Sequence, residues 1–309
     1  MTNNTHTKQR RRLFVRLEED LPPLRLTARD MHILELAYEY RFLTTPQFHA
    51  LVGGSKRYLT ERLSRLFHHR CLDRPKQQMT LRIFGYRYMI YALAQKGAQI
   101  LASYFQNDKF LKSRWTENNR AVRAPQFLHT LMISRFRACL TLACQARSDV
   151  TLSSWQTPDL SLTKYDMEGR KVWVKPDAYF LLTLHGNGTE HRAHFFLECD
   201  RGTMDYSDLR RKLTAYWWMR NDRRLISNWV PRAYRVLTVS PSQERLARLL
   251  TVGKEADSKR KGSLLFYFCY QETYSLEHPQ AILAPIWLSP GDDRRHSLLE
   301  GKGGTNALL

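Results

Sequence analysis

The sequence lacks the features of a membrane or secreted protein. It has no run of about 18 consecutive apolar residues, the length that a transmembrane helix needs. Its mean hydropathy is −0.51. The first residues, MTNNTHTKQRRRLF, contain no apolar stretch of the length found in secretory signals. These absences predict a cytoplasmic protein with no membrane as its partner.

Cysteine is scarce and offers no metal or disulfide pattern. The five cysteines form no CxxC pair and lie scattered, mostly within apolar runs. This is typical of small core residues and argues against a disulfide framework or a zinc ribbon. The 11 histidines form no HxxxH pair, and the double-histidine motif of rolling-circle nickases is not apparent. A histidine metal site is therefore not expected.

Acidic residues are few relative to basic ones. The 309 residues include 29 Asp and Glu against 49 Lys and Arg, a formal charge of +20, and half of this excess lies in the first 110 residues. A field of this sign attracts polyanions, so we expect double-stranded DNA as the partner; an anionic membrane surface and a merely basic surface are the alternatives. With 43% hydrophobic and 12% aromatic residues, the chain can form two domains with cores of their own.

The first third of the chain predicts a DNA-binding domain. The expected elements are a helix starting at Thr27, a short helix from Thr45-Pro46, a third helix from Ser55 to about His69, a β-rich run over 81–91 and a helix over 95–105. Thr27 and Ser55 are N-cap residue types, and Asp30 completes a capping box with Thr27. The order is typical of a winged helix-turn-helix, which we predict over 25–105, after a basic arm over 1–24.

In such a domain the third helix enters the major groove and the hairpin contacts the neighbouring backbone. Polar and basic residues at suitable positions are the candidate DNA contacts: Ser55, Lys56, Arg57, Thr60, Arg62 and Arg65 on the helix, and Lys76, Arg82 and Arg87 on the hairpin. A homodimer on paired half-sites is compatible with this arrangement. The alternative is a winged helix used only for dimerisation or for docking another protein.

The rest of the chain predicts an α/β domain, which makes the whole protein α+β. We expect a polar linker over 106–124, the domain over 125–288 and a disordered tail over 289–309. The expected elements are a helix over 125–147, strands over 150–156, 171–184 and 193–200, a helix over 206–219, a strand over 233–239, a helix over 241–250 and a strand over 264–270. The order α-β-β-β-α-β predicts a central mixed sheet.

Three acidic residues of this domain are candidate metal ligands. Asn187-Gly188 predicts a two-residue hairpin turn, which places Asp177 directly opposite Glu198. Asp200 follows Glu198 by two residues and shares its face of the strand. Three converging carboxylates repel one another unless a cation neutralises them, and oxygen ligands favour Mg²⁺ or Mn²⁺. The alternative is an exposed polar strand end.

The segments around these acids resemble the PD-(D/E)xK nuclease fold, which is restriction-endonuclease-like. Pro176-Asp177 lies on one strand and Glu198-Cys199-Asp200 on the next, with Asp200 where that family has lysine. Some members carry the lysine on the following helix, which suits Lys212, with Tyr216 one turn later. The resemblance implies metal-dependent phosphodiester cleavage, with Asp177, Glu198 and Asp200 as metal ligands and Lys212 as a further catalytic residue.

The chain over about 25–240 also resembles the replication-relaxation family of plasmids and other mobile elements. The segments that carry this resemblance are LTARD at 26–30, RFLTT at 41–45, ALAQKG at 92–97, FLH at 127–129, and FLECDRGT at 196–203 with Lys212-Leu213 and Tyr216. It implies a bacterial protein, nucleoid- or plasmid-associated, acting in DNA replication or relaxation beside other replication or mobilisation proteins. Two functions stay open: a metal-dependent nickase or endonuclease, and a non-catalytic initiator, accessory factor or transcriptional regulator with a degenerate nuclease fold.

Overall fold

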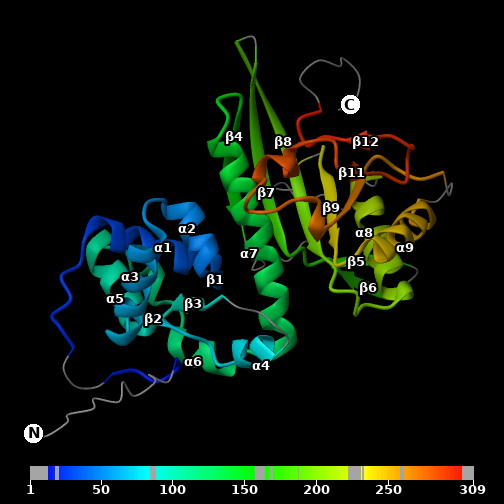
Figure 1. Cartoon of the computed structure of the whole chain (residues 1–309). Helices are drawn as coiled ribbons and strands as arrows, with labels where there is room; N and C mark the ends of the chain where they lie inside the picture. Colours follow the sequence, from blue (N-terminus) through cyan, green and yellow to red (C-terminus); the bar gives the residue numbers. More distant parts are fainter. Residues whose placement is uncertain are drawn as a thin grey trace, which may run out of the picture. The chain divides into compact units, whose positions relative to one another are not determined.

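The protein divides into two compact units, Met1–Ser134 and Arg135–Leu309 (Figure 1). The structure is a computed structural model of the whole chain. It describes residues 13–17, 21–83, 88–156, 164–167, 170–186, 188–221, 231, 233–257 and 261–300. Most of the predicted basic arm and the last nine residues of the predicted tail lie outside these ranges.

The first unit is mainly helical around a three-stranded antiparallel sheet of order β1-β3-β2. Its elements are α1 (Ala28–Tyr40), β1 (Leu43–Thr44), α2 (Thr45–Val52), α3 (Lys56–His68), β2 (Leu72–Asp73), α4 (Gln78–Ile83), β3 (Ile90–Leu93), α5 (Gln95–Phe105), η1 (Asp108–Leu111), α6 (Trp115–Ala121) and the start of α7 (Ala124–Gln145).

The helix starts follow local capping chemistry. Thr27 and Asp30 form the predicted capping box of α1, in which the Asp30 carboxylate accepts a hydrogen bond of 2.7 Å from the backbone N–H of Thr27. Ser55 caps α3, as predicted. Helix α2 is capped by Thr44, one residue before the predicted position, because Gln47 completes a capping box with that residue.

The prediction of a β-hairpin over 81–91 is wrong at its start. Residues 81–83 belong to helix α4, residues 84–87 lie outside the described ranges, and strand β3 starts only at Ile90. The buried amide of Gln78 explains the change. It accepts from the N–H of Ile90 (2.8 Å) and donates to its carbonyl (2.9 Å), so a side chain pairs with the backbone of β3.

The predicted linker over 106–124 is also wrong, because this stretch folds as part of the first unit. Phe110 and Trp115 are buried there, and both make edge contacts with Tyr38 at ring distances of 4.7 and 5.4 Å. Asn119 donates to the carboxylate of Asp73 at 2.8 Å. A few anchoring side chains thus fix a segment whose composition is mostly polar.

The second unit is built on a seven-stranded mixed sheet of order β12-β11-β10-β9-β8-β7-β4, which confirms the predicted α/β class. Strand β9 is parallel to β8 and β10, and the other pairs are antiparallel. Its elements after α7 are β4 (Val150–Gln156), β5 (Lys164–Met167), β6 (Arg170–Trp173), β7 (Ala178–Gly186), β8 (Thr189–Cys199), α8 (Tyr206–Asn221), β9 (Arg235–Ser240), α9 (Gln243–Glu255), β10 (Phe266–Tyr270), η3 (Gln271–Thr273), η4 (Pro279–Leu283), β11 (Trp287–Leu288) and β12 (Arg295–His296).

The β7–β8 hairpin has the predicted register. Gly186 pairs with Thr189 and the ladder continues to Ala178 and Leu197, as a two-residue turn requires. Gly188 has a φ of +76°, a conformation that glycine adopts without strain. The predicted single strand over 171–184 is divided, because its first residues belong to β6, which pairs with β5 in a separate sheet.

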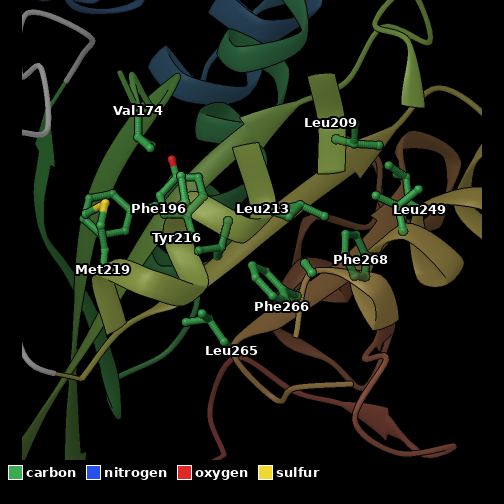
Figure 2. Packing of buried hydrophobic residues seen from close by; sticks show 14 of the residues in the cluster. Val174, Phe196, Leu209, Leu213, Tyr216, Met219, Leu249, Leu265, Phe266 and Phe268 are labelled. Carbon is green, nitrogen blue, oxygen red and sulfur yellow. The ribbon is translucent and has the colours of Figure 1, made fainter. Parts of the chain in front are cut away.

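Alternating side chains of β8 give the sheet two apolar faces. Phe195 stacks on Phe180 at 4.9 Å, and Phe136 of α7 lies 5.8 Å from Phe180 on this side. Phe196 points to the other side, where α8 and α9 pack (Figure 2). The cluster of buried side chains there includes Leu209, Leu213, Tyr216, Leu249, Phe266 and Phe268.

The predicted disordered tail is folded over 289–300. His296 in β12 is fully buried, and its ring nitrogens lie 2.8 Å from Glu300 and 2.7 Å from Asp292. Sequence composition does not reveal such a compact polar cluster. The five cysteine thiols are free and buried. Within the described ranges, no helix combines the length and the apolar character that crossing a bilayer requires.

Candidate functional site

The start of α3 is an exposed basic surface of the first unit. Ser55, Lys56, Arg57 and Thr60 are all exposed, and Lys76 is exposed before α4. The Arg57 side chain is 91% exposed and forms an ion pair with Glu61 at 3.1 Å. These four α3 candidates therefore have the accessibility that a DNA contact needs.

Arg62 does not belong to this surface, which corrects its prediction as a DNA contact. Its side chain is 8% exposed, and its guanidinium binds the buried carboxylate of Asp30 at 2.6 and 2.5 Å. Arg65 is exposed and donates to the carbonyl of Pro23 at 3.3 Å. Arg82 lies on helix α4, where its side chain is not described, and Arg87 lies outside the described residues.

The sequence interpretation missed Arg29 and Tyr58, which lie against the turn before α3. The guanidinium of Arg29 donates to the carbonyl of Gly53 at 2.5 Å and lies 5.6 Å from the ring centre of Tyr58. Gly54 has a φ of +79°, which favours glycine, and a Cβ there would lie 2.9 Å from the guanidinium of Arg29, which would have to shift. Arginine on a preceding helix is common, so the sequence offered no signal for this contact.

The second candidate site lies where β7 begins and β8 ends. The N–H of Asp177 donates to the carbonyl of Leu197 at 3.0 Å, and its carboxylate accepts from the N–H of Cys199 at 2.7 Å. The last pair of the regular β7–β8 ladder is Ala178 with Leu197, so the ladder ends one residue short of Asp177. The Asp177 carboxylate nevertheless lies close enough to affect the ionisation of Glu198 on the neighbouring strand.

Glu198 is bound by two side chains of α8. The hydroxyl of Tyr216 donates to its Oε1 at 2.6 Å, and the Lys212 ammonium pairs with its Oε2. Lys212 and Tyr216 are one helical turn apart, so a single face of α8 supplies both donors. The predicted proximity of Asp177, Glu198 and Lys212 is therefore present.

Burial dominates the ionisation of this group. It raises the pKa of Glu198 to about 7; the positive charge of Lys212 opposes the shift, and the negative charge of Asp177 adds to it. Burial alone would lower the pKa of Lys212, but the charges of Glu198 and Asp177 outweigh it and raise that pKa. The ammonium group is thus held in its charged form beside Glu198.

Asp200 does not join this cluster, which corrects the expectation of three converging acids. Its carboxylate accepts from Arg245 at 2.6 Å and from the N–H of Gly202 at 2.9 Å. Across the described residues, no three His, Cys, Asp or Glu side chains gather in a way that could hold a metal ion. Asp200 pairs with Arg245 and Glu198 pairs with Lys212, so the predicted three-carboxylate site for Mg²⁺ or Mn²⁺ is not formed.

A family model described as replication-relaxation matches residues 34–225, which is well over half of the chain. The chain belongs to the replication-relaxation family. The match includes α3, Asp177, Glu198, Lys212 and Tyr216, and ends before Arg245. The resemblance seen in the sequence is thereby confirmed at the level of the family. No significant match is found among curated proteins or among solved structures.

Proposed function

We propose that this replication-relaxation protein binds double-stranded DNA of a plasmid or other mobile element, with α3 in the major groove, and acts without cutting it. The observation that carries the DNA-binding proposal is the exposed start of α3, where Lys56 and Arg57 face solvent. Phosphate contacts of such residues supply affinity, and polar neighbours contact base edges.

The element order of the first unit supports this proposal. Helix α2, the Gly53-Gly54 turn and α3 follow one another as in a helix-turn-helix, and β1, β2 and β3 form the small sheet that accompanies them in a winged helix. Ser55 caps α3, so the positive end of the helix dipole adds to the charge of Lys56 and Arg57.

A pair of double variants tests this proposal. We expect Lys56→Ala with Arg57→Ala to weaken binding to a duplex by about tenfold or more and to reduce the slope of log affinity against log salt by about 2, because two phosphate contacts are lost. Fluorescence anisotropy over a salt series measures both quantities. The matched control is Lys112→Ala with Arg114→Ala, which removes the same charge and an equivalent exposed ion pair, Arg114–Glu117.

The control variant should keep the affinity and the salt slope of the wild type. If both double variants lose affinity equally, the net charge and not α3 carries the binding. The proposal extends to a homodimer on paired half-sites and to association with a bacterial nucleoid or plasmid. It also includes other replication or mobilisation proteins as partners. Each of these extensions requires that α3 binds DNA.

The non-catalytic part of the proposal is carried by Glu198, whose oxygens are both engaged by side chains of α8. The alternative is a metal-dependent nickase or endonuclease. We expect supercoiled plasmid to stay intact with the wild-type protein in Mg²⁺ or Mn²⁺. Nicking by the wild type that is lost in both Asp177→Ala and Glu198→Ala would overturn the non-catalytic proposal; nicking that survives both would come from a contaminant.

A further inference from the structure

The Asp177–Glu198 pair carries its own cation. Asp177 directly precedes β7 and accepts from the N–H of Cys199, the residue after Glu198 in β8, and the Lys212 ammonium of α8 pairs directly with Glu198. Neighbouring like charges in a buried place are unfavourable unless a cation compensates them. Lys212 therefore fills the electrostatic role that the sequence assigned to a divalent metal ion.

We propose that the ammonium group of Lys212 is the resident cation of the Asp177–Glu198 carboxylate pair and excludes divalent metal ions from it. This inference rests on the non-catalytic part of the proposed function. It makes Lys212 a positioning residue that holds α8 against β8, and it gives the pair a specific chemistry, since the pair binds a protein cation in place of Mg²⁺ or Mn²⁺.

The groups around the carboxylates are hydrogen-bond donors. The backbone N–H of Cys199 donates to Asp177, and the hydroxyl of Tyr216 donates to Glu198. Each of these donors occupies one lone pair of a carboxylate oxygen, so a divalent cation would have to share these oxygens with the protein donors. The carboxylate surroundings thus match an ammonium ion and a phenol better than a hexacoordinate metal ion.

The donor Tyr216 is itself held in place. It is fully buried, its ring lies 5.8 Å from that of Phe196, and its backbone carbonyl accepts from the hydroxyl of Tyr234 at 2.9 Å. Because α8 cannot turn without breaking these contacts, Lys212 stays directed at Glu198.

The third acid of the segment has a protein cation as well. Arg245 of α9 donates to Asp200 at 2.6 Å and to the carbonyl of Met204 at 2.8 Å. Glu198 near the end of β8 and Asp200 just after it are thus each paired with a cation from a different helix. A single bound metal ion would require both helices to release their cations.

Manganese titration of the full-length protein tests the inference. We expect the wild type to bind no Mn²⁺ in the low millimolar range by electron paramagnetic resonance. Lys212→Met removes the ammonium group but keeps the length of the side chain, and we expect it to gain at least about tenfold in Mn²⁺ affinity. Lys212→Arg, which keeps the charge, should bind no more Mn²⁺ than the wild type.

Adding Glu198→Gln to Lys212→Met should abolish the gained binding. If the wild-type protein binds Mn²⁺ and Asp177→Asn abolishes this binding, the inference is wrong. This comparison does not depend on the folding of a Lys212 variant. A folded Lys212→Met that binds no Mn²⁺ also overturns it. If Lys212→Met folds only when Mn²⁺ is added, the inference is supported. DNA affinity, measured alongside, reports on α3 and separates failure of this inference from failure of DNA binding.

Discussion

Each unit of the protein contains a buried carboxylate paired with a cation from another element, and the two pairs differ in ionisation. In the first unit Asp30 of α1 binds Arg62 of α3; in the second, Glu198 of β8 binds Lys212 of α8. Hydrogen bonds lower the pKa of Asp30, whereas the pKa of Glu198 is raised to about 7.

The difference lies in the donors and in the neighbouring charges. Burial raises the pKa of Asp30 as well, but Arg62 supplies two hydrogen bonds and Thr27 two more, at 2.5–2.7 Å. Glu198 has fewer donors and a second carboxylate, Asp177, beside it. Burial alone therefore does not decide the charge of a buried acid; the number of donors and the nearest like charge do.

The largest expected effect comes from removing the cation of the first pair. Arg62→Ala leaves the buried Asp30 carboxylate without its main partner, which should lower the free energy of unfolding of the first unit by about 3–5 kcal/mol. Denaturant unfolding measures this. Arg57→Ala, on the same helix but exposed, should change it by less than about 0.5 kcal/mol. Equal effects of the two variants would show that Arg62 is not the structural residue of α3.

Raising the pH should change the contributions of the two pairs to stability in opposite directions. The folded-state pKa of Asp30 is below its ordinary 3.8, so its stabilising contribution is present above that value and is lost as the pH falls through the folded-state pKa. The folded-state pKa of Glu198 is above its ordinary 4.5, so its contribution is present below 4.5 and is lost as the pH rises through about 7.

Hydrogen exchange, corrected for intrinsic rates, follows both pairs in one protein. Protection of β8 and α8 should fall between pH 5 and 8 by an amount on the order of 2 kcal/mol, while protection of α1 and α3 stays constant. Glu198→Gln should remove the slope in β8. A fall of the same size in α1 and α3 would mean that the slope has another origin.

The features that the sequence predicted well depend on neighbours along the chain. The Thr27–Asp30 capping box and the turn at Asn187-Gly188, with the register that it fixes, involve residues close in sequence. The predictions that were wrong depend on distant partners. Arg62 sits on a basic helix, and only the fold brings it to Asp30; Arg245, from another helix, takes Asp200 out of the acidic cluster.

Tyr216→Phe should have a smaller effect than the pH change. It removes one hydrogen bond from Glu198 without opening a cavity, so we expect a loss of about 1–2 kcal/mol above pH 7, where Glu198 is ionised. Denaturant unfolding at pH 8 measures the loss, which should shrink at pH 5. Tyr206→Phe, at an exposed position of the same helix, is the matched control and should change nothing. A pH-independent loss would show that packing, not the hydrogen bond, is affected.

The smallest effect concerns the exposed ion pair at the start of α3. Arg57 and Glu61 lie 3.1 Å apart with side chains 91% and 61% exposed, so Glu61→Gln should alter stability by less than about 0.5 kcal/mol. It should nevertheless tighten DNA binding by about two- to fivefold, because a negative charge facing the phosphates is removed and Arg57 is released to them. Anisotropy at low salt gives the largest difference.

The matched control for this variant is Glu117→Gln, which breaks the similarly exposed pair between Glu117 of α6 and Arg114, the residue before that helix. Both variants raise the net charge by one, so long-range attraction changes equally in the two proteins. Only a contact at α3 makes Glu61→Gln the tighter binder. Equal gains from the two variants would assign the effect to net charge, and weaker binding of Glu61→Gln would mean that Glu61 itself accepts a hydrogen bond from a base, as carboxylates do from cytosine N4.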